Sequence, residues 1–314
     1  MDRPSPYRIL ALDGGGIRGY LSALLLARLE RERPGLLGRF DLLAGTSTGS
    51  IIALSLAAGF SPAEIAELYA HNVRRIFETT LARRLREANG LLGPRYGVQR
   101  LAAALRTVFS DRRLGDLPRK VLVPAFDLDD ENPDPARRRW KSRLFHNFPG
   151  DGGDAACLLR KVALYSSVVP AVFASVDGYV DGGLFAANPA LCAVALALEK
   201  CGDANGSHIP DLRLLSLGTG LGPLHLGEET EQWGLAQWAR PLLGLVLDAG
   251  VGMVDYQCRQ LLRGNYHRLN PWIEGPAILL DDLSALDRLH EAAETADLAP
   301  ALAWLDATIL GAAR

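Results

Sequence analysis

Cysteine and methionine are scarce in this 314-residue chain, which contains four cysteines and two methionines. No two cysteines form a C-x-x-C pair, and none is grouped with histidine at a spacing typical of a metal site. We therefore expect reduced thiols that act as small core residues in a cytoplasmic protein, with no metal ion and no disulfide framework. The cysteines are Cys157, Cys192, Cys201 and Cys258.

Long apolar runs are also missing. No stretch reaches the roughly 18 to 20 uninterrupted apolar residues that a membrane-spanning helix needs. The first residues, MDRPSPYRIL, lack the charged-then-apolar pattern of a signal peptide. The most apolar late segment, PLLGLVLDAGVGMV, is short and contains Asp248. We expect a protein that is soluble or peripherally bound to membranes.

An excess of one charge is absent overall, since the formal net charge is −2. The charges are nevertheless unevenly spread: residues 1–145 contain 24 Lys and Arg against 16 Asp and Glu, and the remainder contains 10 against 20. Arginine dominates residues 74–113 and the segment RRRWK at 137–141. A solvated helix face and a reversible contact with an anionic membrane surface explain this pattern equally well. Trp140 is a single aromatic in the basic segment RRRWK, which is more typical of a surface strand, so we expect no nucleic-acid partner.

Apolar strands alternate with helical stretches along the chain, and the 48% apolar content suffices for a large core. This alternation predicts a single three-layer α/β/α domain with a mostly parallel central sheet. Strands are predicted at Tyr7–Leu12, Phe40–Gly45, Val121–Leu128, WKSRLFHNF and Leu212–Gly220. Helices are predicted from about Tyr20, after Ser47, from Ser61, over Val98–Phe109, before Pro170, after Asn188 and Pro189, and from about Leu283. An Arg-rich helical section between Ser61 and Phe109, joined by NGLLGPRYG, is expected to cap the site.

The stretch FDLLAGTSTGSIIAL, Phe40 to Leu54, predicts a buried strand, a sharp turn and a helix. Ser47 occupies the turn between Gly45 and Gly49, which permit the close backbone approach that such a turn requires. The turn exposes the hydroxyl beside the N-terminus of the following helix, where N–H groups favour developing negative charge. Ser47 is therefore the candidate nucleophile.

A second glycine-rich turn, DGGGIRG, follows the first predicted strand. Its spacing satisfies G-x-G-x-x-G, but no acidic residue ends the second strand to bind a ribose, and no G-K-[ST] follows. The alternative use is an oxyanion hole, in which the N–H groups of Gly14, Gly15 and Gly16 converge on one oxygen, with Arg18 adding positive charge. Turns that follow adjacent parallel strands meet at the carboxyl edge of the sheet, where ligands bind.

A third motif, DGG at 181–183, precedes an apolar helix. In this order, DGGGIRG, GTSTG and DGG resemble the signature segments of the patatin-like phospholipase family of lipid acyl hydrolases, from about Tyr7 to Gly220. The resemblance implies that Ser47 is the nucleophile, Asp181 the general base, Gly14, Gly15 and Gly16 the oxyanion loop, and Arg18 its basic position. Many family members have DGA where this chain has DGG, and both keep a small residue after the aspartate.

The implied function is phospholipase A-type cleavage of carboxylic esters in membrane glycerolipids by a Ser-Asp dyad, with no cofactor. The resemblance also admits a small-molecule activator, because bacterial members include toxins and defence effectors. Residues 1–220 are expected to form the catalytic domain, and residues 221–314 a helical extension packed on it. Asp13 competes with Asp181 for the role of base, although its position before the glycines suggests that it orients them.

Two alternatives stay open. A general α/β-hydrolase would use a Ser-Asp-His triad, for which His225, His267 and His290 are available. A non-catalytic lipid- or nucleotide-responsive module would need neither Ser47 nor Asp181, and both are present.

Overall fold

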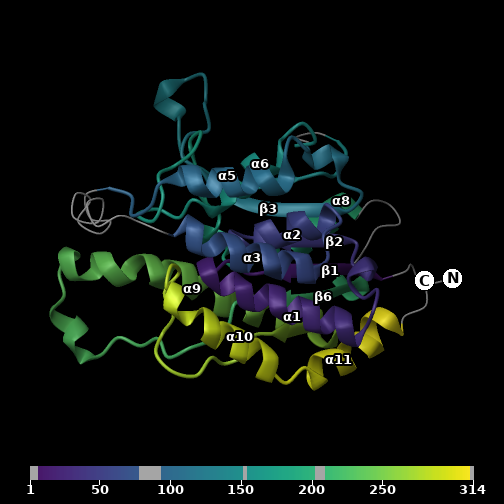
Figure 1. Cartoon of the computed structure of the whole chain (residues 1–314). Helices are drawn as coiled ribbons and strands as arrows, with labels where there is room; N and C mark the ends of the chain where they lie inside the picture. Colours follow the sequence, from purple (N-terminus) through teal and green to yellow (C-terminus); the bar gives the residue numbers. More distant parts are fainter. Residues whose placement is uncertain (1–5, 78–92, 151–153, 202–208, 312–314) are drawn as a thin grey trace.

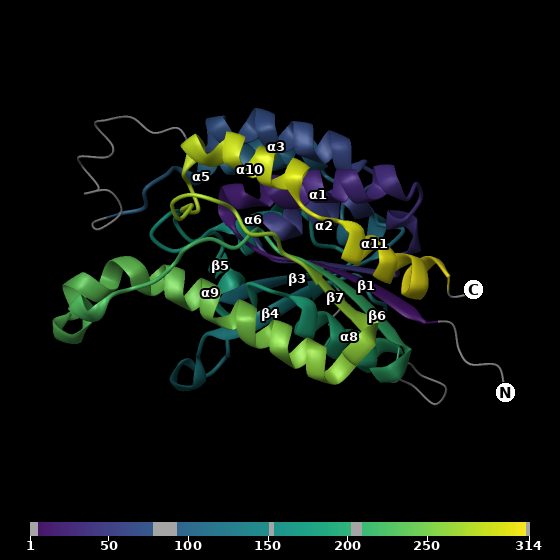
Figure 2. The same cartoon turned by 90° about the horizontal axis from the view of Figure 1, so that it is seen from below.

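The computed structural model describes residues 6–77, 93–150, 154–201 and 209–311, and Figure 1 shows their arrangement. A central sheet is covered by helices on both faces (Figure 2). The strands are β1 (Tyr7–Leu12), β2 (Leu42–Gly45), β3 (Lys120–Asp127), β4 (Lys141–His146), β5 (Tyr179–Asp181), β6 (Leu212–Leu217) and β7 (Tyr266–Leu269). The helices are α1 (Gly19–Glu32), α2 (Thr48–Ala57), α3 (Pro62–Ile76), α5 (Val98–Phe109), α6 (Leu159–Ser167), α7 (Gly183–Ala186), α8 (Ala190–Cys201), α9 (Leu235–Leu262), α10 (Leu286–Thr295) and α11 (Ala299–Leu305).

The sheet has the order β4-β3-β2-β1-β6-β7, with β5 also paired to β3. The pairs β3-β2, β2-β1, β1-β6 and β6-β7 are parallel, whereas β4 and β5 run antiparallel to β3. The predicted α/β class and the mostly parallel sheet are therefore confirmed. Parallel strands need helices on both faces, which explains why β1, YRILAL, is apolar at nearly every position.

Alternate residues of β1 bury against different layers. Leu10 and Leu12 belong to the core under α1, α2, α3, α5, α6 and α10. Ile9 and Ala11 belong to the core on the other face, which α8 and the end of α9 cover. This period of two follows from the strand geometry. The parallel pairing of β1 with β2 places the carboxyl ends of both strands at the same edge of the sheet.

Local signals predicted several elements well. The α3 helix begins with a capping box, in which the Ser61 side chain accepts from the Glu64 N–H and Glu64 accepts from the Ser61 N–H, and Pro62 occupies the first helical position. The ranges of β1 and α5 agree with the predicted ones. Part of the expected Arg-rich cap, residues 78–92, lies outside the described residues.

The C-terminal third differs from the expectation of helices alone. The strand β7 joins the sheet beside β6, with Leu214 opposite Tyr266 and Leu217 opposite Leu269. Its sequence, YHRL, has two polar residues in four, so nothing in its hydropathy distinguishes it from a loop. The 28-residue α9 helix before it packs on α7 and α8. Residues 221–314 therefore contribute to the sheet as well as to its covering.

No helix within the described residues is both long enough and apolar enough to span a bilayer. Cys258 is buried, and Cys157 and Cys192 are half-buried free thiols.

Candidate active site

Ser47 lies in the turn between β2 and α2, in a backbone conformation that L-residues seldom adopt, with φ 52° and ψ −123°. The glycines on either side make that turn possible. A Cβ at Gly45 would lie 2.1 Å from the carbonyl oxygen of Gly49, and a Cβ at Gly49 would lie 2.2 Å from that of Leu12. This strand–turn–helix geometry is that of a nucleophile elbow.

The backbone of Ser47 is held by a residue that the sequence did not single out. The Ser47 N–H donates to Ser166 Oγ at 2.9 Å, and the Ser166 hydroxyl donates to the Pro124 carbonyl at 2.6 Å. Ser166, at the end of α6, is fully buried. Because it connects the turn to β3, Ser166 is a positioning residue for the serine.

Asp181 ends β5, which pairs with β3 at Ala125. Its side chain is 1% exposed, and its Oδ1 accepts the Gly183 N–H at 2.6 Å. Burial raises the pKa of Asp181 to about 7, although the Ser47 hydroxyl beside it and the Gly183 amide both lower the pKa. Among the described residues, Asp181 Oδ2 has no partner that meets hydrogen-bond geometry, so the Ser47 hydroxyl is close without being aligned on it. An apo site often tightens such a contact only when substrate binds.

The glycine loop lies directly against Ser47. A Cβ at Gly14 would come within 3.2 Å of the Ser47 Cβ, and Gly16 has φ 57°, where a side chain would strike the Leu280 carbonyl. The N–H of Gly14 donates to the Ala187 carbonyl at 2.8 Å. It is therefore engaged within the fold and is not a free donor for an oxyanion, in contrast to the expectation from the sequence. In the described part of the chain, no acceptor is found for the N–H groups of Gly15 and Gly16, which makes these two the available donors.

Arg18 and Asp13 have different surroundings. Arg18 is half-buried and pairs with Asp248 of α9 across 3.7 Å. Asp13 is bound by Arg268 of β7, whose Nη2 donates to Asp13 Oδ2 at 2.6 Å, and Arg268 Nη1 also donates to Ser216. The pair is almost wholly buried, so Asp13 anchors the start of the glycine loop to β7. This agrees with an orienting role and leaves Asp181 beside Ser47.

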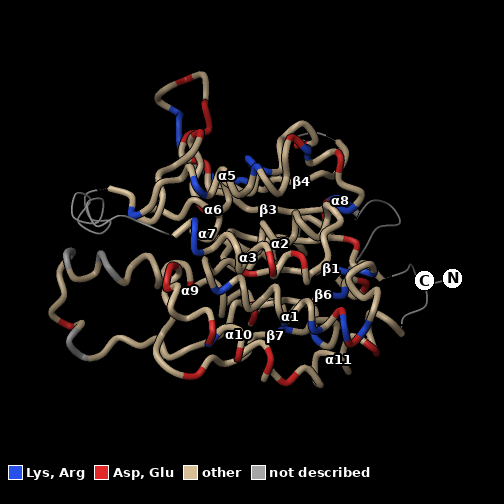
Figure 3. The backbone as a smooth tube through the Cα atoms, viewed as in Figure 1, with Lys and Arg blue, Asp and Glu red and all other residues tan. Residues whose placement is uncertain are grey.

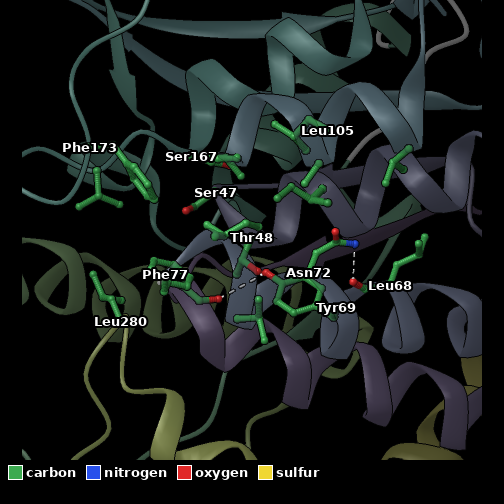
Figure 4. A pocket seen from close by; sticks show the side chains of 18 of the residues that line it. Ser47, Thr48, Leu68, Tyr69, Asn72, Phe77, Leu105, Ser167, Phe173 and Leu280 are labelled. Carbon is green, nitrogen blue, oxygen red and sulfur yellow. Dashed lines mark hydrogen bonds between the residues drawn. The ribbon is translucent and has the colours of Figure 1, made fainter. Parts of the chain in front are cut away.

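Two connected spaces meet at Ser47. The larger one, about 850 Å³ with open solvent included, runs between α2, α3, α5 and α6, and its lining is almost entirely apolar. Figure 4 shows Ser47 at this space, with Phe77, Leu105 and Phe173 around it. The smaller one, about 310 Å³, is bounded by the glycine loop, Asp181, Leu247 and Leu280. A lipid could thus place its acyl chain in one space and its ester at the other.

Histidines lie elsewhere in the described residues. His267 stacks on Trp304, and His290 stacks on Tyr20. His225 is exposed in the segment before α9, and His146 on β4 is buried next to Asp154. No histidine in the described ranges lines either space at Ser47, and these residues include no group of three His, Cys, Asp or Glu that could hold a metal ion.

A model of the patatin-like phospholipase family matches residues 10–194. The chain belongs to the patatin-like phospholipase family. Its relatives include the putative sporulation hydrolase CotR of Bacillus subtilis, 36% identical over 73% of this chain and 68% of that protein. Protein teg of Priestia megaterium is 31% identical over 96% of this chain and 98% of its own length. The cGAMP-activated phospholipase of Pseudomonas aeruginosa is 32% identical over 90% of this chain and 83% of its own length.

Membership in the patatin-like phospholipase family supports lipid hydrolase activity for this chain. The sequence motifs singled out Ser47, Asp181 and the glycine loop, which lie together around the smaller space. They gave no sign of Ser166, Arg268, Leu247 or Leu280, because each of these reaches the site from a distant part of the chain.

Proposed function

We propose that this protein is a phospholipase A-type lipid acyl hydrolase in which Ser47 is the nucleophile and Asp181 the general base. One observation carries the proposal: a buried carboxyl whose pKa is raised to about 7 lies beside an elbow serine at the end of an apolar chamber. An ordinary aspartate, with a pKa near 3.9, would be a weak base for a serine hydroxyl. Burial makes Asp181 a stronger base at neutral pH.

The reaction has two halves. In the first, Ser47 Oγ attacks the ester carbonyl carbon while its proton passes to Asp181, and the resulting oxyanion accepts hydrogen bonds from Gly15 and Gly16. The protonated Asp181 then donates its proton to the departing alkoxide, which leaves as the alcohol. In the second half, Asp181 takes a proton from water, and the hydroxide attacks the acyl-Ser47 carbonyl. As the carboxylic acid departs, Asp181 returns the proton to Ser47 Oγ, which regenerates the serine hydroxyl and the Asp181 carboxylate.

The proposed substrate is a phospholipid or another glycerolipid. The larger space extends between α2, α3, α5 and α6, and its apolar walls suit an acyl chain. No cofactor enters this scheme. Contact with an anionic membrane surface remains part of the proposal, although many of the arginines are engaged within the protein: Arg95 pairs with Asp281, Arg112 donates to Ala58 and Arg138 pairs with Asp129.

The test compares single variants on a soluble ester and on a mixed lipid extract, with fluorophosphonate labelling as a second readout. Ser47→Ala should abolish turnover and labelling while the thermal midpoint stays nearly unchanged. Asp181→Asn should abolish turnover because an amide cannot accept the proton. The variants His225→Ala, His267→Ala and His290→Ala should each keep activity within about tenfold of the parent, a barrier change of roughly 1.4 kcal/mol. One folded histidine variant without turnover would favour the triad.

An activator belongs to the same proposal, because two relatives, from Pseudomonas aeruginosa and Vibrio cholerae, are named cGAMP-activated phospholipases. We propose that a small molecule of this kind raises the turnover of this chain. Turnover on the lipid extract with and without cGAMP measures the effect directly. An unchanged rate would remove this activator and leave the hydrolase assignment intact.

A further inference from the structure

The α9 helix is apolar on two sides. Towards the protein, Leu243 and Leu247 pack on the core, and Cys258 is buried further along the helix. Towards solvent, a second apolar set is exposed by at least 40%: Leu242, Leu245, Val246, Met253 and Tyr256. Helices that are apolar all round are normally buried on all sides. The outward set, called here the α9 stripe, therefore presents an apolar surface that nothing in the described chain covers.

The stripe carries almost no charge. Within residues 241–256 the charged side chains are Asp248, which pairs with Arg18 at the site, and Asp255, which pairs with Arg259. Figure 3 shows how few charged positions lie along this part of α9, and Figures 1 and 2 show its N-terminal half extending beyond the body of the molecule. An apolar surface of this kind fits the boundary between the headgroups and the acyl chains of a bilayer, where apolar side chains are buried. Few charged groups would have to leave water at that boundary.

The stripe is also continuous with the proposed site. Leu247, on the same two turns of α9, bounds the space that contains Ser47 and Asp181. A Cβ at Gly183 would lie 2.8 Å from Leu247 Cδ2. Leu280 bounds both spaces, and its neighbour Leu279 is 63% exposed. A second copy of the chain on this surface would cover the rim of the smaller space at Asp248. A bilayer on the same surface would instead present lipid to that rim.

We infer that the α9 stripe docks the protein on a lipid bilayer through apolar contact and so places the mouth of the site against its substrate. This inference rests on the proposed function for the identity of the substrate. It also changes how membrane binding should depend on salt, compared with the contact through arginines considered under the proposed function. Apolar docking persists on neutral vesicles and at high salt, whereas contact through arginines would require anionic lipid and weaken with salt.

The experiment uses the double variant Leu242→Glu/Val246→Glu, which puts two carboxylates on the stripe without touching the lining of the site. The matched control, Ala303→Glu/Ala307→Glu, adds the same charge at the same four-residue spacing to exposed positions in α11 and the segment that follows it, away from α9. Both are made in the Ser47→Ala background for co-sedimentation with phosphatidylcholine vesicles, so that hydrolysis does not alter the vesicles. Both are also made in the active background for kinetics.

The stripe variant should bind neutral vesicles about tenfold or more weakly than the parent, because burying even one such side chain contributes enough for that factor. Its hydrolysis of vesicle lipid should fall by a similar factor, while hydrolysis of a short soluble ester stays within about twofold. The control should behave like the parent in all three assays. Equal vesicle binding by the stripe variant and the parent would overturn the inference, as would parent binding that needs phosphatidylglycerol and disappears at high salt.

Light scattering adds a further criterion. A parent dimer that the stripe variant converts to a monomer would assign the surface to a second copy and refute bilayer docking. Failure of the proposed function would look different, because Ser47→Ala would then retain esterase activity whatever the vesicles show.

Discussion

Asp181 combines full burial with a position beside Ser47, and its titration should appear in the kinetics. Because burial raises the pKa of Asp181 to about 7, the carboxyl is increasingly protonated as the pH falls below 7, and a protonated carboxyl cannot accept the serine proton. We expect kcat/KM on a soluble ester to fall about tenfold per pH unit below about pH 7. Circular dichroism at each pH checks that the protein stays folded. A flat profile down to pH 5 would contradict the assignment of the base.

Gly49 tests the turn itself. A Cβ there would lie 2.2 Å from the Leu12 carbonyl oxygen, so Gly49→Ala must displace either β1 or the start of α2. We expect a loss of about 1 to 3 kcal/mol in the free energy of unfolding, as for overpacking in a core, together with a fall in kcat of about 100-fold or more through displacement of Ser47.

Gly38→Ala is the control for that variant, because no atom lies within 4 Å of a Cβ at Gly38 and its φ is not positive. It should leave both stability and turnover near the parent values. Comparable kcat for Gly49→Ala and Gly38→Ala would show that the elbow tolerates a side chain where the geometry allows none.

At the scale of elements, a buried ion pair joins two strands that are not neighbours in the sheet. Arg268 of β7 pairs with Asp13 at the end of β1, and β6 lies between these strands. Removing one partner of a buried pair leaves the other charge without compensation and typically costs about 3 to 5 kcal/mol. Arg268→Met should therefore lower the free energy of unfolding by that amount in urea titrations. The double variant Asp13→Asn/Arg268→Met should recover part of the loss, since no lone buried charge remains.

Arg259→Met provides the comparison for this pair. Arg259 and Asp255 also form an ion pair, on α9, but Arg259 is 56% exposed. Exposed pairs contribute about 0 to 1 kcal/mol, so this variant should change stability far less than Arg268→Met. Equal losses for the two arginines would show that burial of the Asp13–Arg268 pair has no special effect.

Elements with strong local signals could be predicted from the sequence. The capping residues Ser61 and Glu64 define the start of α3, and the apolar run of β1 predicts a buried strand. The strand β7 could not be predicted in this way, because YHRL becomes a strand only through its parallel pairing with β6. This dependence on a distant partner is the physical reason why the sequence predicted only helices in the C-terminal third and missed β7.

Over the whole molecule, the same division holds for the site. Ser47 and the glycine loop belong to short motifs that contain both the glycines needed for the turn and the groups proposed to act chemically. The raised pKa of Asp181 depends on burial, which a three-residue motif does not specify. Ser166 reaches the turn from 119 residues away, and the hydrogen bond that uses the Gly14 N–H comes from Ala187. Such contacts follow from the packing of layers and have no sequence signature.

The Asp13–Arg268 pair limits how this chain can be recombined with its relatives. The family model ends at residue 194, yet Arg268, Leu247 and Leu280 all come from later in the chain. A chimera joined near residue 220 would exchange three features in a single step: the anchor of the glycine loop, one wall of the space beside Ser47 and the outward face of α9. A change of lipid preference in such a chimera could not be attributed to any one of them. Such a chimera would change lipid preference and stability at the same time. A chimera designed to change lipid preference alone would have to keep Arg268 and replace only the residues around Leu247.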